Sequence, residues 1–263
     1  MTTNPTRCDE VQVHGAPVGA AGLFAAVVAL GDDHLILGHR LSEWCGHAPM
    51  LEEDLAMPNM ALDMLGQARA LYSYVAELEG KGRTEDDIAY LRTDRDYRNC
   101  LLVERPNGDF AHTMLRQFYF AAFMHPYWQA MTASTDPTLR AIAGKAEKEI
   151  AYHVKHAGEW VIRLGDGTEE STRRMQTAVN TLHPYTPELV ADEGVDFAVV
   201  PGRAGMRARF EATVGEVFGE AGLEIPEVAF PLSGGREGRH GEEFGYLLAE
   251  LQYMQRTYPG LTW

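Results

Sequence analysis

The sequence predicts an all-α protein built as a four-helix bundle with additional C-terminal helices. Three observations predict this fold. Four long segments, each roughly 20–30 residues, carry apolar side chains at helical spacing. Several of these segments begin and end with residues that are typical of helix caps. Runs of alternating polarity, which indicate strands, do not recur, and VDFAVV at 195–200 stands alone as a strand candidate.

The chain is expected to begin with a flexible N-terminal tail at residues 1–18, followed by a single helical domain at 19–263. The first helix is expected at 23–44, where apolar residues recur at helical spacing. The second is expected at 52–78, and it opens with three acidic residues that suit a helix N-terminus. Pro58 should kink or restart this helix, because proline lacks the N–H donor and clashes one turn back.

A short helix is expected at 84–92, with Thr84 as its N-cap. A long helix should follow at 107–131, where Pro126 is a second expected kink.

The clearest helix covers 136–165, because Asp136 can act as N-cap, Pro137 suits the first helical position and Gly165 suits the end. The region at 223–239 is rich in proline and glycine and is expected to be an irregular connection. Further helices are expected at 169–182, 204–221 and 240–257.

The composition and net charge argue against two classes of partner, nucleic acid and membranes. The 263 residues are 45% hydrophobic, so a large core can form, and the net charge of −15 argues against a nucleic-acid partner. Three cysteines without a CxxC spacing fit a reducing compartment. The apolar run at 19–31 is too short to span a bilayer. We therefore expect a soluble, cytoplasmic protein that binds neither nucleic acid nor a membrane.

The second helix carries a polar row in apolar surroundings. Asn59, Asp63 and Gln67 are spaced four apart and share one stripe. The apolar residues predict burial on most sides of this helix. They are Met60, Leu62, Met64, Leu65, Leu71 and Val75. A buried carboxylate needs partners, so the row is either a hydrogen-bonded network that ties helices together or a row of metal ligands.

The stretch EKEIAYHVKHAGEW at 147–160 poses the same question. Glu149, His153 and His156 project within roughly 60° of one another on a helix. A carboxylate and two imidazoles on one stripe could form half of a metal site or the polar edge of a core helix. The neighbouring apolar positions place His153 at the edge of the core and Glu149 further out.

A di-iron bundle takes one Glu from each of two helices and a Glu-x-x-His pair from each of the other two. An acid stands three residues before a histidine only at Asp109-x-x-His112, in the opening turn of a helix, and at Glu237-x-x-His240, in the glycine-rich region.

The two candidate helices also lack the required histidine. Three positions after Asp63 the sequence has Gly66, and three positions after Glu149 it has Tyr152. His153 comes one position too late for the di-iron spacing. The sequence therefore predicts the helical architecture of a di-iron protein without its ligand set.

Other motifs are weaker. Cys45 with His47 and Glu43 could bind zinc, but this lone Cys-x-His has no second ligand pair. Cys45 and His47 could also form a nucleophile pair, which would require spatial assembly and an orienting acid. GGREG at 234–238 lacks the preceding strand and the following GK[ST] of a phosphate loop. Six aromatic residues of the 107–131 helix are most simply core residues. They are Phe118, Tyr119, Phe120, Phe123, Tyr127 and Trp128.

Four stretches together resemble the C subunits of bacterial phenylacetyl-CoA epoxidases, and the resemblance covers about residues 20–263. They are LSEWCGHAPMLEEDLAMPNMALDMLGQAR (41–69), NCLLVERPNGDFAHTMLRQFYF (99–120), AEKEIAYHVKHAGEWVIRLGDGT (146–168) and AELQYMQRTYPGLTW (249–263).

The resemblance implies a ferritin-like bundle within a cytoplasmic multicomponent monooxygenase that forms the ring 1,2-epoxide of phenylacetyl-CoA. In that family the di-iron centre lies in a paralogous catalytic chain. A separate reductase supplies electrons from NADPH through FAD and an iron–sulfur cluster. The family implies that the present chain is the structural partner of the catalytic one, so no catalytic residue and no cofactor are expected in it.

Residues that could be remnants of a metal site are Glu43, Asp63, Glu149 and His153. Basic side chains could compensate for an absent metal charge, and these are Arg40, Lys145, Lys148, His153 and His156. Two alternatives stay open. One is a metal-binding oxidase or oxygenase in its own right, using Asp63, Glu149 and His153, and the other is a stand-alone ferritin-like binding or storage protein.

Overall fold

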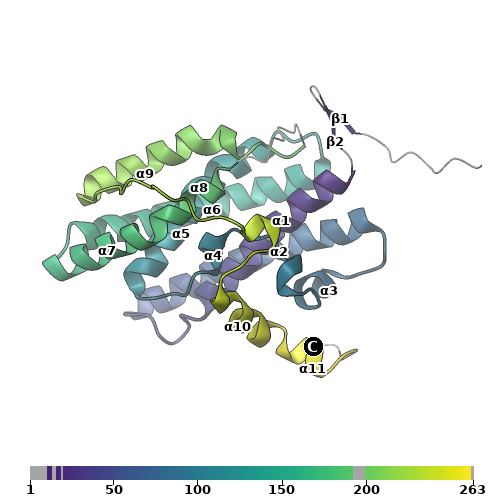
Figure 1. The fold of residues 1–263 in the computed structure, drawn as a ribbon, viewed down its shortest axis with the longest axis horizontal. Helices are drawn as coiled ribbons and strands as arrows, with labels where there is room; N and C mark the ends of the chain where they lie inside the picture. Colours follow the sequence, from purple (N-terminus) through teal and green to yellow (C-terminus); the bar gives the residue numbers. More distant parts are fainter. Residues whose placement is uncertain (1–10, 14–15, 19, 192–198, 262–263) are drawn as a thin grey trace, which may run out of the picture.

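The computed structural model describes residues 11–13, 16–18, 20–191 and 199–261, and nearly all of them belong to a helical bundle and its connections (Figure 1). Four long helices form the centre, namely α1 (Ala20–Ser42), α2 (Leu51–Glu79), α5 (Phe110–Met131) and α6 (Pro137–Gly165). Helix α1 packs on α2 and α5 packs on α6, and one long connection joins the two hairpins. A single long crossover is the ferritin-like arrangement, so the predicted fold class is confirmed.

Shorter elements cover the two halves of the bundle. The crossover contains α3 (Glu85–Tyr90), η1 (Asp94–Asp96) and α4 (Leu101–Glu104). On the α5–α6 half lie α7 (Glu169–Leu182), η2 (His183–Tyr185), α8 (Thr186–Leu189), η3 (Ala204–Met206) and α9 (Arg207–Ala221) (Figure 1). The C-terminal η4 (Gly235–Glu237), α10 (Glu242–Leu251) and α11 (Tyr253–Thr257) return to the crossover side.

The predicted caps are present. The Thr84 hydroxyl accepts from the Asp87 N–H, and the Asp87 carboxylate accepts from the Thr84 N–H, which forms a capping box. The Asp136 carboxylate accepts from the N–H groups of Thr138 and Leu139, both at 2.9 Å. These local signals fix where α3 and α6 begin.

The two internal prolines do not divide their helices. Pro58 lies inside α2 and Pro126 lies inside α5, and each helix continues on both sides of its proline. Helix α2 therefore does not restart at Pro58, and the expected kinks at Pro58 and Pro126 stay predictions. Packing along the length of the bundle outweighs the single hydrogen bond that each proline removes.

Two short strands lie within the N-terminal segment that was expected to be a flexible tail, and its flexibility stays a prediction. Val11–Val13 and Ala16–Val18 form a short antiparallel pair, β1 and β2. Most of the strand candidate at 195–200 lies outside the described residues, and Val199 and Val200 of that stretch are in a bend.

The N-terminal core helix is longer than its apolar run suggested. Gly22–Ser42 spans 21 residues with a mean hydropathy of 1.2, so by length and composition it could cross a membrane. The sequence expectation concerned only the apolar run at 19–31, and the helix extends beyond that run past the two aspartates at 32 and 33. In the fold, 61% of this stretch is buried within the protein, as in the core helix of a globular bundle.

Helix α2 is not buried on most sides, contrary to the sequence expectation. Leu51, Leu55 and Leu62 are exposed to 69%, 58% and 64%. Their spacing places them on one outward stripe, opposite the buried methionines of the same helix. The bundle therefore leaves one apolar helix face uncovered in this chain.

Candidate functional site

Polar side chains line the seam between α2 and α6, which run in opposite directions. Asp63 meets His153, and Gln67 meets Glu149 one turn further along. Both pairs follow from four-residue spacing on each helix, which puts the polar side chains on facing stripes. The sequence prediction of a network that ties helices together is confirmed.

His153 is the best-defined member of this seam. Its Nε2 lies 3.2 Å from the Asp63 carboxylate, and the Gln117 side-chain amide donates to its Nδ1 at 3.1 Å. The amide makes Nδ1 the acceptor, so the proton sits on Nε2 and is donated to Asp63. The His153 side chain is fully buried, and the prediction that it lies at the core edge is therefore wrong. Because α5 supplies Gln117, three of the four bundle helices meet at this imidazole.

Glu149 has partners of its own. Its carboxylate accepts from the Gln67 amide at 2.9 Å and from the Lys145 ammonium at 3.2 Å. One further contact closes the seam, between the His156 Nε2 and the Glu53 carboxylate at 2.9 Å. The carboxylates of Glu53, Asp63 and Glu149 are thus each held by side chains of the protein, through pairs that join α2 to α6 or lie within α6.

The seam does not assemble a metal-ligand group. Within the described part of the chain, no three His, Cys, Asp or Glu side chains are grouped so that they could hold a metal ion. Asp63 contacts His153, but Glu149 bonds to an amide and an ammonium instead of joining them. Glu43 lies elsewhere, paired with Arg40 at 2.9 Å. That this chain holds no metal stays a prediction.

Helix α1 contributes His34 to the bundle interior. Its Nδ1 hydrogen-bonds with the Leu30 carbonyl at 2.7 Å, and its ring packs against Phe120 and Trp128 of α5. Burial lowers the pKa of His34 from 6.5 to about 4, so the imidazole is neutral near pH 7. A neutral imidazole in an aromatic environment is a packing group at this position.

The two acid-x-x-His matches serve local roles. Asp109 caps α5 by accepting from the backbone N–H of His112, and its carboxylate lies 3.0 Å from the His112 ring. Glu237 pairs with Arg239 instead of with His240. At the Cys45 motif, the His47 ring contacts the Cys45 carbonyl oxygen and not the thiol.

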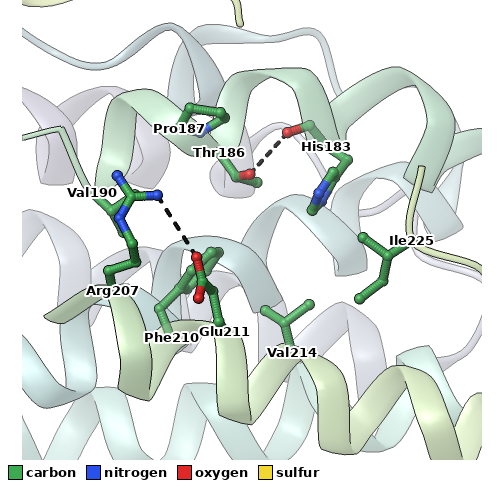
Figure 2. Close-up of a pocket in the computed structure, with 9 residues that line it drawn as sticks. All are labelled: His183, Thr186, Pro187, Val190, Arg207, Phe210, Glu211, Val214 and Ile225. Atoms are coloured by element: carbon green, nitrogen blue, oxygen red, sulfur yellow. Dashed lines mark hydrogen bonds and ion pairs between the residues drawn. The ribbon is translucent and has the colours of Figure 1, made fainter. Parts of the chain in front are cut away.

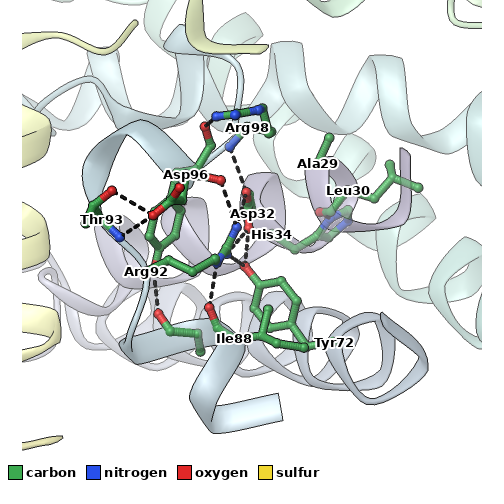
Figure 3. Close-up of polar contacts among 12 residues, drawn as sticks. Ala29, Leu30, Asp32, His34, Tyr72, Ile88, Arg92, Thr93, Asp96 and Arg98 are labelled. Atoms are coloured by element: carbon green, nitrogen blue, oxygen red, sulfur yellow. Dashed lines mark hydrogen bonds and ion pairs between the residues drawn. The ribbon is translucent and has the colours of Figure 1, made fainter. Parts of the chain in front are cut away.

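A second polar cluster, which sequence reasoning missed, is buried between α1 and the crossover (Figure 3). The Asp32 carboxylate accepts from the Arg92 guanidinium, the Tyr72 hydroxyl and the Arg98 backbone N–H. Asp32 is fully buried, and burial together with this carboxylate raises the pKa of the Tyr72 hydroxyl. These donors replace the water that burial removes from the carboxylate.

The neighbouring Asp33 binds a different part of the chain. Its carboxylate lies 2.7 Å from Arg236 and 3.7 Å from Arg203, and it accepts from the Cys100 N–H at 2.8 Å. Arg236 belongs to the GGREG motif, so that motif anchors the C-terminal segment on α1. The aspartates at 32 and 33, within an apolar helix, were the sequence signal that could have indicated this cluster.

Two buried glutamates also anchor the C-terminal segment. Glu104 accepts from the Gly241 N–H at 2.7 Å and lies 2.7 Å from the His240 ring. Glu188 accepts from the N–H groups of Leu101 and Gly234. These contacts join the crossover, α8 and the C-terminal segment, and they are structural in character.

A separate hollow of about 260 Å³ lies between α8 and α9, away from the α2–α6 seam (Figure 2). Its walls are mostly apolar. The lining residues are His183, Thr186, Pro187, Val190, Arg207, Phe210, Glu211, Val214 and Ile225.

The fold defines a ferritin-like helical protein in which the bundle seam is occupied by polar pairs between side chains of the same chain. Comparison with known families agrees with this class. A model described as "Phenylacetic acid catabolic protein" matches residues 15–263, and the chain belongs to this family. It is 44% identical over 246 residues to the C subunit of the 1,2-phenylacetyl-CoA epoxidase of Escherichia coli (strain K12), covering 92% of this chain and 99% of that protein.

Proposed function

We propose that this chain is a non-catalytic structural subunit of a multicomponent monooxygenase that epoxidises the ring of phenylacetyl-CoA. Its partner would be the paralogous catalytic chain that carries the di-iron centre. The Escherichia coli epoxidase chain supports this proposal through 44% identity over almost its whole length. Within the complex, NADPH, FAD and an iron–sulfur cluster would belong to the reductase, and the assembly would be cytoplasmic.

The observation that carries a non-catalytic role is the pairing along the α2–α6 seam. His153 donates to Asp63 while Glu149 accepts from Gln67 and Lys145, so the candidate ligands are satisfied by one another and by their neighbours. A catalytic metal site keeps ligands directed at a common point and leaves an open position. The alternative of an independent oxygenase at Asp63, Glu149 and His153 therefore has weaker support.

The observation that supports a protein partner is the outward face of α2. Leu51, Leu55 and Leu62 form an exposed apolar stripe, and Tyr152 of α6, which is also exposed, borders the seam beside His156. Contiguous apolar side chains on the surface of a folded protein are typical of an interface. Obligate interfaces are larger and more apolar than transient ones.

Co-expression with the catalytic chain tests the proposal. The two chains should co-purify at a fixed ratio, and Leu62→Glu should weaken the complex by at least about tenfold, because it places a charge in the apolar stripe. Phe230→Glu is the matched control, since Phe230 is exposed on the loop after α9 and does not belong to the α2 stripe. Failure of the unaltered chains to associate would refute the proposed partnership. Equal loss with both variants would refute the role of the α2 face.

A further inference from the structure

The hollow between α8 and α9 has features of a small-ligand site that the proposed structural role does not use. Its volume of about 260 Å³ exceeds the roughly 150 Å³ that suffices for a benzene ring in an engineered protein cavity. The apolar walls are formed by Phe210 and Val214 from α9, by Pro187 from α8 and by Val190 directly after α8. A compact apolar group of ring size would therefore fit.

A hydrogen bond from Tyr119 determines which nitrogen of the His183 ring carries the proton. The Tyr119 hydroxyl lies 3.0 Å from the Nδ1 of His183, and Tyr119 is fully buried. Burial raises the pKa of the Tyr119 hydroxyl, which therefore keeps its proton, and among the described residues His183 is its hydrogen-bond partner. A buried hydroxyl donates where it can, so Nδ1 is the acceptor.

The other ring nitrogen of His183 then carries the proton. Burial also lowers the pKa of His183, which favours the neutral ring with a single N–H at Nε2. The ring lines the hollow and projects from the α8 side toward α9 (Figure 2). The hollow thus offers one neutral donor among apolar walls.

The charges at the rim favour an uncharged ligand. Arg207 and Glu211 lie one helical turn apart on α9, with 3.7 Å between guanidinium and carboxylate. The two charges compensate each other, so neither a free carboxylate nor an ammonium group gains a net partner at the mouth.

We propose that this hollow binds a compact apolar group, about one aromatic ring in size, that carries one uncharged carbonyl oxygen as acceptor for His183 Nε2–H. Neutral aromatic ketones, esters and thioesters share this chemistry. Apolar walls with one placed polar group are typical of small-molecule sites.

Acetophenone and ethylbenzene form a matched probe pair, because they differ in the carbonyl group and share the ring and the chain length. Ligand-observed NMR titration of the full chain should give acetophenone about five- to tenfold tighter binding than ethylbenzene, the ratio expected for one hydrogen bond. Benzoate should bind more weakly than acetophenone, because its carboxylate loses water and gains no net charge partner from the Arg207–Glu211 pair.

Three variants and one control distinguish the contribution of the apolar walls to binding from that of the His183 donor. His183→Phe should bring the two probes to equal affinity, and Tyr119→Phe, which leaves the tautomer free, should reduce the ratio while ethylbenzene binds as before. Ile225→Trp at the exposed rim should weaken both probes, and Phe230→Trp outside the hollow should weaken neither. Circular dichroism melting establishes that each variant is folded.

Two results would overturn the proposal. One is the absence of binding by either probe up to its solubility limit, as expected if the hollow only accepts water or a partner's side chain. The other is a preference for acetophenone that survives His183→Phe, or an affinity for both probes that Ile225→Trp leaves unchanged.

Discussion

The Nε2 of His153 lies 3.2 Å from the carboxylate of Asp63, and the two residues join α6 to α2 at the centre of the bundle seam. His153 is fully buried, whereas the Asp63 side chain is 37% exposed. The contact therefore combines a desolvated imidazole with a carboxylate that water can still reach. This hydrogen bond holds two helices together, so its loss should lower the free energy of unfolding.

Asp63→Ala should lower the free energy of unfolding by about 1–2 kcal/mol, because the buried His153 N–H loses its acceptor. The effect is smaller than for a fully buried ion pair, since Asp63 is partly solvated. Urea unfolding measures it, with Asn59→Ala on the exposed side of α2 as the control. Asp63→Asn, which keeps an acceptor, should lose less. An unchanged unfolding midpoint together with abolished turnover of the assembled complex would contradict this account.

Arg92→Met should be more damaging, with a loss of about 3–5 kcal/mol, because it strands the fully buried Asp32. The Tyr72 hydroxyl and the Arg98 N–H would still contact the carboxylate, but its charge would no longer be neutralised. Arg174→Met, at an exposed pair with Glu170, serves as the control and should leave stability nearly unchanged, because water screens this pair. Similar losses in the two variants would show that the Asp32 cluster does not stabilise the fold.

His34 should make stability dependent on pH. Its folded-state pKa of about 4 lies below the ordinary value of 6.5, so protons bind preferentially to the unfolded chain between these values. The stabilisation by the neutral ring is complete above about pH 6.5 and is lost as the pH falls toward 4, at about 1.4 kcal/mol per pH unit.

His34→Phe should flatten that dependence by about this slope, whatever its effect on stability at pH 7. Unfolding curves of the unaltered chain and the variant, measured between about pH 4.5 and 7.5, give both slopes. An unaltered slope in His34→Phe would exclude His34 as the titrating group.

Gly235→Ala should destabilise the packing of the C-terminal segment on the crossover. A Cβ at Gly235 would lie 2.2 Å from the Asn99 carbonyl oxygen, which is backbone and cannot rotate away. We expect a loss of about 1–3 kcal/mol and earlier proteolysis of the C-terminal segment than of the bundle. Gly245→Ala, in open space on α10, is the control. Equal behaviour of the two variants would show that the close contact is not required.

Local chemistry explains which parts of this fold were predictable. Thr84 and Asp136 cap their helices within three residues of themselves, so their roles are visible in the sequence. The four-residue spacing of Asp63 and Gln67 likewise revealed a stripe, and the stripe meets its partners on α6. Spacing along one helix fixes which residues share a face.

Ion pairs between residues that are distant in the sequence could not be predicted from local spacing. Asp32 and Arg92 are 60 residues apart, and Asp33 and Arg236 are 203 apart, so no local pattern links them. The exposed position of Leu62 was missed for a related reason, since apolar character alone does not say whether the neighbour is the same chain or another.

Metal analysis of the purified chain, expressed with iron and manganese supplied, tests the central claim most directly. If the α2–α6 seam is held together by its own polar pairs, iron and manganese should be far below one equivalent per chain, and His153→Ala should not change that content. About one or more equivalents of iron or manganese, lost on substitution of Asp63 or His153, would contradict the claim that this chain is a non-catalytic partner.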